Sequence, residues 1–175
     1  NAHKMGEAPV IYDDQLTQIS MQQLEQQMNN MGYFNAKIDT QKVYKKKKVN
    51  LTYLITARQP YKVRHYEVDV PIEAISTIAQ NDGCKIKQGE NFSTSTLDQE
   101  RERIATVMRN RGYFYFDKTM LEYTADSALG SHEVDVKLQL APYVLQMDSN
   151  ALKQLRRQYT IRKVHYQIDY DPSIL

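Results

Sequence analysis

The sequence has no tryptophan, a single cysteine and no apolar run of about 18 residues or more. Cys84 cannot form an internal disulfide, and it has no second cysteine with which to build a metal cluster. We interpret it as a small, partly buried hydrophobic residue. The lack of a long apolar run excludes a membrane-spanning helix from this sequence.

Motifs of catalysis and metal binding are missing as well. The sequence contains no G-x-S-x-G, Walker loop, H-E-x-x-H or Cys–His arrangement. Its histidines are scattered without metal-ligand spacing, and no pair of acidic residues flanks a recognisable cleft. We therefore expect no catalytic activity, no cofactor and no metal. An enzyme would reveal itself by a closed concavity with converging polar groups.

What the sequence does contain is typical of a globular protein. Hydrophobic residues make up 41% and charged residues 25% of the chain, and 13 residues are tyrosine. Tyrosine suits half-buried sheets and recognition surfaces equally well. The net charge is only +2, so we expect no nucleic-acid partner.

An internal repeat is the main organising signal. Four landmarks occur twice in the same order: Gly-Tyr-Phe at 32–34 and 112–114, an alternating strand at 49–55 and 134–140, Pro-Tyr at 60–61 and 142–143, and His-Tyr at 65–66 and 165–166. Each Gly-Tyr-Phe follows a helical pattern, predicted over 14–31 and 96–111. Gly32 and Gly112 stand where a left-handed residue ends a helix.

Residues 61–142 read as one complete module of order β-α-α-β-β. Its opening strand is predicted at 61–70, and Pro71 begins a short helix. The longer helix buries Leu97, Ile104 and Met108, and its four charges from Glu100 to Arg103 are expected to face water. Two strands follow, at 115–124 and 134–140.

The flanking copies are predicted to be partial. Residues 6–60 lack an opening strand and first helix, whereas 143–175 comprise a connector, with a possible short helix, and an opening strand at about 159–170. Residues 1–5 are interpreted as a tail, because Asn1 and Ala2 are typical of a tag remnant. We expect the chain to be a segment whose targeting signal and membrane part lie outside it. An orphan strand at one end and a missing strand at the other predict that any dimer forms by strand exchange.

This pattern resembles the POTRA (polypeptide-transport-associated) domains of the BamA/TamA outer-membrane assembly superfamily. Residues 97–114 and 130–136 look like the TamA-like surface-antigen proteins of Bacteroidetes. The resemblance covers residues 6–170. It implies an α+β fold of tandem modules, each with a three-stranded mixed sheet covered on one face by two helices. It also implies a location at the periplasmic side of the outer membrane and a parent chain that continues into a membrane β-barrel.

The resemblance implies binding of unfolded outer-membrane proteins, or of a periplasmic accessory protein, by strand augmentation. An unpaired sheet edge can accept an extended chain with little regard to its sequence. The family places the opening strand at one edge and the last strand in the centre, so the predicted edge site lies on Tyr115, Asp117, Thr119, Leu121 and Tyr123. Two alternatives stay open: a spacer or docking arm for one fixed partner, and the POTRA arm of a two-partner secretion transporter.

A run of four lysines, Lys45, Lys46, Lys47 and Lys48, lies between two predicted strands. The simpler interpretation is a solvated hairpin tip. The functional alternative is contact with anionic lipid headgroups or with an acidic partner segment.

Overall fold

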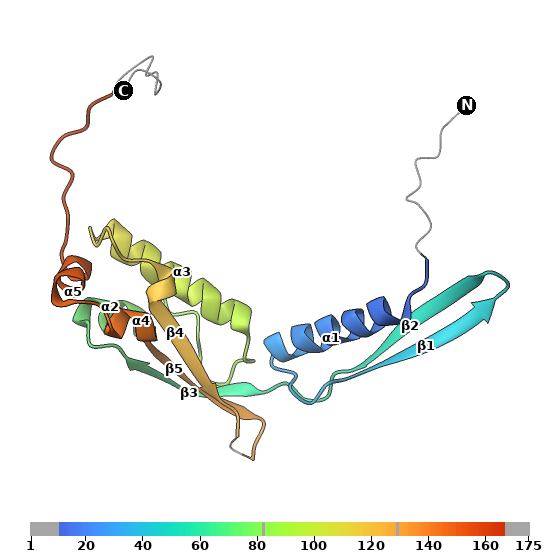
Figure 1. Cartoon of the computed structure of the whole chain (residues 1–175). Helices are drawn as coiled ribbons and strands as arrows, with labels where there is room; N and C mark the ends of the chain where they lie inside the picture. Colours follow the sequence, from blue (N-terminus) through green and yellow to red (C-terminus); the bar gives the residue numbers. More distant parts are fainter. Residues whose placement is uncertain (1–10, 82, 129, 167–175) are drawn as a thin grey trace. The chain divides into compact units, whose positions relative to one another are not determined.

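The computed structural model describes residues 11–81, 83–128 and 130–166 (Figure 1). The fold is of the α+β class, as predicted. The chain forms two compact units. Of the described residues, the first unit comprises those in 11–67, 85–98 and 124–137, and the second comprises those in 68–84, 99–123 and 138–166.

The first helix is followed directly by a β-hairpin. Helix α1 spans Asp14–Asn30, strand β1 spans Lys37–Lys45 and strand β2 spans Lys48–Thr56. Helix α1 begins where it does because the Asp13 carboxylate accepts hydrogen bonds from the backbone N–H groups of Gln15 and Leu16. The hairpin strands pair antiparallel from Lys37↔Thr56 to Lys45↔Lys48, which leaves a two-residue turn.

A three-stranded sheet is built from β3 (Lys62–Asp69), β4 (Leu121–Asp126) and β5 (Glu133–Leu140). Its order is β3-β5-β4, so the last strand in sequence is the central one. Side chains alternate along β5 between buried and half-buried. The ion pairs Arg64–Asp135 and Glu67–Lys137 advance in the same direction along both strands, so β3 and β5 run parallel (Figure 1). The sheet is therefore mixed, as predicted.

Helices α2 (Glu73–Ala79) and α3 (Thr94–Asn110) supply much of the core beside this sheet. Their apolar side chains are fully buried, as are those of the central strand: Ile75, Ile78, Ile104, Met108, Val134 and Leu138. A short 3₁₀ turn, η1 (Lys118–Met120), precedes β4, and helices α4 (Pro142–Leu145) and α5 (Ser149–Leu155) follow β5. Helix α5 agrees with the short helix considered for the connector.

The predicted tandem repetition is not clean. Only the stretch from β3 to β5 has the order β-α-α-β-β. The described residues before β3 give α1-β1-β2, and those after β5 give two short helices. The repeated Pro-Tyr also fails as a landmark, because Pro142 begins helix α4 and does not lead into a strand.

Two strand predictions need correction. Strand β4 begins at Leu121 and not at residue 115, because the Asp117 side chain accepts a hydrogen bond from Thr119 N–H (2.9 Å) and closes the turn η1. Residues 159–166 of the predicted strand 159–170 form no strand; among the described residues, the one backbone hydrogen bond of this stretch runs from Tyr159 N–H to the carbonyl of Gly112. Residues 167–170 lie outside the described part of the chain.

The charged run on α3 also departs from the prediction. Glu100 is fully buried and the Arg103 side chain is 16% exposed, although both were expected to face water. They form a two-point ion pair, with Arg103 Nε to Glu100 Oε2 at 2.8 Å and Nη2 to Oε1 at 2.5 Å. Arg103 Nη2 also donates to the carbonyl of Ile78, near the end of α2 (2.7 Å). The two-point pairing and the bond to the Ile78 carbonyl offset part of the desolvation cost of burying these charges.

Candidate partner-binding edge and joints

Strand β4 forms one edge of the sheet, and the predicted edge residues are distributed around its start. Leu121 and Tyr123 lie on β4, but the Leu121 side chain is 1% exposed. Thr119 lies in η1, and Asp117 is its N-cap. Tyr115 lies in the preceding loop and is 47% exposed. The structure therefore does not bring the five residues together along one straight strand.

The turn before β4 is held by polar contacts. The Asp117 carboxylate accepts from both the backbone N–H (2.9 Å) and the hydroxyl (2.8 Å) of Thr119. The backbone bond, followed by the hydroxyl bond, lowers the pKa of Asp117 below its usual value, so the carboxylate stays charged. The hydroxyl of Thr119 lies 3.2 Å from that of Tyr143. These contacts fix the point at which the edge begins.

The hydrogen bonds around η1 show which backbone groups of β4 point outward. Ala141 N–H donates to the carbonyl of Met120 (2.9 Å), so the backbone carbonyl of Met120 points toward the strand β5 side. Leu121 N–H donates to Lys118 O, and its carbonyl accepts from Arg101 Nη1 (3.3 Å). In antiparallel pairs, alternate residues direct both backbone groups to the partner strand. Continued along β4, this alternation directs the backbone groups of Leu121, residue 123 and residue 125 away from β5, and those of Glu122 toward it.

The sheet surface next to the end of β4 is strongly charged. Arg64 donates to Asp135 through two bonds, of 2.9 and 2.5 Å, and these bonds lower the pKa of Asp135 and raise that of Arg64. A hollow of about 440 Å³ lies beside this pair and is lined by residues of all three strands, including His65, Glu67 and Asp126. Such a surface favours polar over apolar side chains of a bound segment.

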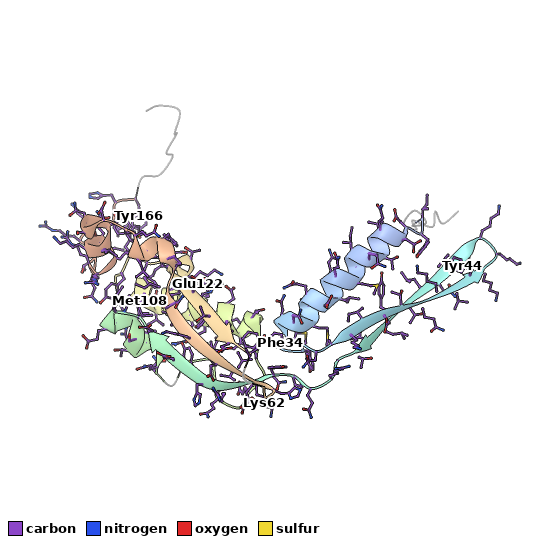
Figure 2. All side chains as sticks on the ribbon, turned by 60° about the horizontal axis from the view of Figure 1, so that its bottom comes forward. Phe34, Tyr44, Lys62, Met108, Glu122 and Tyr166 are labelled. Atoms are coloured by element: carbon purple, nitrogen blue, oxygen red, sulfur yellow. The ribbon has the colours of Figure 1, made fainter. Side chains whose placement is uncertain are left out.

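A joint connects the end of α1 to the chain that enters β3. Tyr61 N–H donates to the carbonyl of Gly32 (2.8 Å), and the Phe34 ring lies 4.9 Å from that of Tyr61 in an edge-to-face arrangement. Figure 2 shows Phe34 at the end of α1. The ring of Phe92 covers Phe34 (5.6 Å), and the ring of His132 lies 5.3 Å from Tyr61. We call these residues the first joint.

The first joint leaves no room for a side chain on Gly32. Its φ is +83°, and a Cβ there would lie 2.7 Å from the carbonyl oxygen of Phe92. The loop that carries Phe92 also pairs with the entering strand, because Phe92 N–H donates to Tyr61 O and Val63 N–H donates to Glu90 O (both 2.9 Å). Sequence patterns predicted the left-handed glycine but missed Phe92 and His132.

The same arrangement begins again at the end of α3. Tyr159 N–H donates to the carbonyl of Gly112 (2.7 Å), and the rings of Phe114 and Tyr115 lie 6.5 and 5.4 Å from that of Tyr159. Gly112 has a φ of +92°, and a Cβ there would lie 2.7 Å from Tyr159 O. We call these residues the second joint. The structural counterpart of Tyr61 is therefore Tyr159 and not Tyr143; helices α4 and α5 lengthen the interval.

The four lysines lie at the tip of the β1–β2 hairpin, which confirms the hairpin prediction. Lys45 pairs with Lys48, and Lys46 and Lys47 form the turn. All four side chains are exposed, and Lys46 has a φ of +55°. Tyr44, labelled near this tip in Figure 2, is 67% exposed. The tip thus combines clustered positive charge with an aromatic ring.

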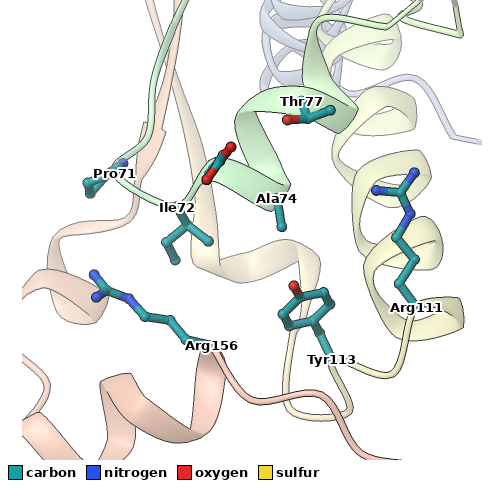
Figure 3. A pocket seen from close by; sticks show the side chains of 8 residues that line it. Pro71, Ile72, Ala74, Thr77, Arg111, Tyr113 and Arg156 are labelled. Atoms are coloured by element: carbon teal, nitrogen blue, oxygen red, sulfur yellow. The ribbon is translucent and has the colours of Figure 1, made fainter.

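Another hollow, of about 470 Å³, lies beside α2 (Figure 3). Arg111 and Arg156 lie on opposite sides of it with Tyr113 between them, and Glu73 adds a negative charge. The two guanidinium groups do not converge on one point. Across the described residues, no group of three His, Cys, Asp or Glu side chains could hold a metal ion. The helices among these residues also include none with the length and hydrophobicity of a membrane span.

Comparisons with known proteins give one matching family model and several similar solved structures. Residues 7–58 match the POTRA family model, described as "Surface antigen variable number repeat". The chain is similar to solved structures of Haemophilus influenzae BamA POTRA3-5 (17% identity, 71% of this chain and 49% of that chain, TM-score 0.46) and of Haemophilus ducreyi BamA lacking POTRA domains 1–3 (15%, 78% and 24%, TM-score 0.43). A third is POTRA1-3 of Omp85 from Anabaena (13%, 74% and 51%, TM-score 0.36).

The chain spans about half the length, or less, of these structures. No curated protein matches the sequence. The narrower likeness to TamA-like proteins of Bacteroidetes stays a prediction. The match over residues 7–58 is thus to a POTRA family model, and the solved structures to which the chain is similar contain POTRA domains of BamA and Omp85.

Proposed function

We propose that this chain forms periplasmic POTRA modules of an outer-membrane protein assembly or translocation factor, and that it binds extended segments of unfolded outer-membrane proteins at the β4 edge. The proposed modules are residues 6–60 and 61–142, followed by a connector and the start of a further module at 143–175. The role is one of binding, since POTRA domains are non-catalytic.

The observation that carries the proposal is the position of β4 at the edge of the sheet. An edge strand offers backbone N–H and C=O groups at regular spacing, and these bind another extended chain without reading its sequence. Such indifference to sequence suits a factor that handles many different unfolded chains. The hydrogen bonds around η1 support an outward direction for the backbone groups of residues 123 and 125, and the added strand would then lie along these two residues.

The contact set of the proposed site follows from this register. Tyr123 and Ala125 would lie alongside the bound segment, whereas Leu121 already has its N–H and carbonyl bonded within the chain. Tyr115, Asp117 and Thr119 would flank the end of the segment, and the charged hollow beside Asp126 would contact its side chains. Ala125 is thus the sharpest position for a test.

Replacing Ala125 by proline removes one outward N–H group and leaves the pairing toward β5 intact, because edge strands tolerate proline at outward positions. We expect Ala125→Pro to weaken binding of a synthetic ten-residue peptide from an outer-membrane β-strand about tenfold, measured by fluorescence anisotropy. One lost hydrogen bond is worth about 1 kcal/mol, and the proline ring also crowds the edge. Ala125→Val, which keeps the N–H, is the matched control and should bind normally.

Circular dichroism of both variants establishes that the fold survives. Equal binding by Ala125→Pro and the wild-type chain would refute strand addition at this edge.

A second candidate function is a docking arm for one fixed periplasmic partner. The first joint favours this function, because a docking arm needs restrained connections along its length. The hydrogen bond and the ring contact of the joint restrain the chain between α1 and β3. Affinity capture from an envelope extract separates the two functions. One stoichiometric partner would support the arm, and a heterogeneous set of barrel proteins would support the binding of unfolded chains.

A further inference from the structure

The two joints share their central contacts but differ in what covers them. In both, a tyrosine N–H donates to the carbonyl of a left-handed glycine, and the phenylalanine two residues after that glycine packs near the tyrosine ring. In the first joint, a loop and a neighbouring turn cover the pair. Among the described residues, no equivalent loop covers the second. We propose that the second joint is a docking surface for the aromatic loop of a further POTRA-like module.

The first joint shows what the occupant must supply. Phe92 is 4% exposed, and its ring packs against Phe34 at 5.6 Å. The same loop pairs antiparallel with the chain after Tyr61, through the bonds Phe92 N–H to Tyr61 O and Val63 N–H to Glu90 O. His132 adds a ring beside Tyr61. The occupant therefore brings an aromatic side chain, a backbone donor and a backbone acceptor.

The second joint exposes the groups to which such an occupant would bind: aromatic rings and backbone polar groups. Phe114 is 70% exposed and Tyr159 is 38% exposed, although their counterparts Phe34 and Tyr61 are half-buried. Ile161, two residues after Tyr159 as Val63 is after Tyr61, is 81% exposed, and within the described part of the chain its N–H meets no acceptor. An aromatic ring of the occupant packed on Phe114 would bury this apolar surface. An extended segment of the occupant beside residues 159–161 would pair with their backbone groups.

The chain's own aromatic loop cannot serve as this occupant. Residues 89–92 are already bonded to Tyr61 and Val63 in the first joint, so filling the second joint requires another loop of the same chemistry. The aromatic rings make a phosphate or a metal ion a poor fit, because the surface offers apolar area and peptide groups in place of a convergent charge. This inference does not depend on strand addition at β4.

The test supplies the missing loop on a tether. The full chain is extended after Leu175 by a flexible Gly/Ser linker that ends in a copy of residues 87–97. A tether of this kind holds the loop at millimolar effective concentration. The readout is amide hydrogen exchange by NMR. We expect exchange of the Ile161 amide to slow at least tenfold. The reason is that Val63, its counterpart in the first joint, donates its N–H to the loop at Glu90 O.

Two matched controls isolate the proposed contacts. In one, the phenylalanine of the appended loop that copies Phe92 is replaced by alanine; in the other, the chain carries Phe114→Ala. Both should return Ile161 to fast exchange, while a protected Val63 amide in the same sample shows that the fold is intact. Fast Ile161 exchange in the tethered wild-type chain, or slow exchange that survives both controls, would overturn the proposal. So would a protected Ile161 in the chain without the tether.

Discussion

Replacing Gly32 by alanine is expected to disrupt the first joint. A residue with a side chain costs about 1–2 kcal/mol in the left-handed region, and Gly32 has a φ of +83°. The new Cβ would also lie 2.7 Å from the carbonyl oxygen of Phe92, and that carbonyl belongs to backbone that cannot simply rotate away. Relief of the overlap separates the loop from the joint and breaks the bond from Tyr61 N–H to Gly32 O, worth about 1 kcal/mol.

Gly89 provides a matched control. Its φ is +84°, nearly the same as that of Gly32, but nothing lies within 4 Å of the position of its Cβ. We expect Gly89→Ala to lower the free energy of unfolding by about 1 kcal/mol, through backbone strain alone. Gly32→Ala should lower it by about 2–3 kcal/mol, since it adds the lost bond and the displaced ring.

Urea unfolding followed by circular dichroism compares the two variants, and hydrogen exchange locates the change. The Tyr61 amide should exchange faster in Gly32→Ala and at its normal rate in Gly89→Ala. Equal losses of stability in both variants, with Tyr61 still protected, would refute the close approach at Gly32 as the reason for glycine.

Two further perturbations probe the core and the hairpin tip. Arg103→Met removes the ion-pair partner of the buried Glu100 carboxylate, so we expect the free energy of unfolding in urea to fall by about 3–5 kcal/mol. The double variant Arg103→Met, Glu100→Leu should recover most of that loss. A loss below about 1 kcal/mol in the single variant would contradict the buried ion pair. Replacing all four lysines of residues 45–48 by glutamine should lower the affinity for anionic phosphatidylglycerol vesicles more than tenfold in a co-sedimentation assay. The reason is that each lysine contributes about 1 kcal/mol near such a surface. Unchanged co-sedimentation at low salt would exclude a lipid role for the tip.

The helices and their ends were predictable because their signals are local. The patterns gave helices at 14–31 and 96–111, and the structure has α1 at Asp14–Asn30 and α3 at Thr94–Asn110. The left-handed glycines were predictable for the same reason, since only glycine takes that conformation without strain. The central position of β5 was implied by the family resemblance and is found in the structure.

Side-chain ion pairs and turns, and contacts between distant segments, were not predictable from the sequence. Glu100 looks like a solvent-facing charge, but in the structure it is buried and paired with Arg103, which also donates to the Ile78 carbonyl. Residues 115–124 were predicted to form one strand, but the side chain of Asp117 closes a turn within that stretch. The joints were missed because the partners of Gly32 and Phe34 come from loops far along the chain.

The strand order has a consequence for how the sheet forms during synthesis. Strand β5 is the last of its sheet to emerge, yet β3 and β4 both pair with it. Strands β3 and β4 therefore cannot pair with β5 until residues 133–140 have left the ribosomal exit tunnel. Strands β1 and β2 are adjacent in the sequence, so they can pair as soon as both have emerged. A nascent chain halted before residue 133 would thus hold two orphan strands, and it is at this stage that a chaperone would be most needed.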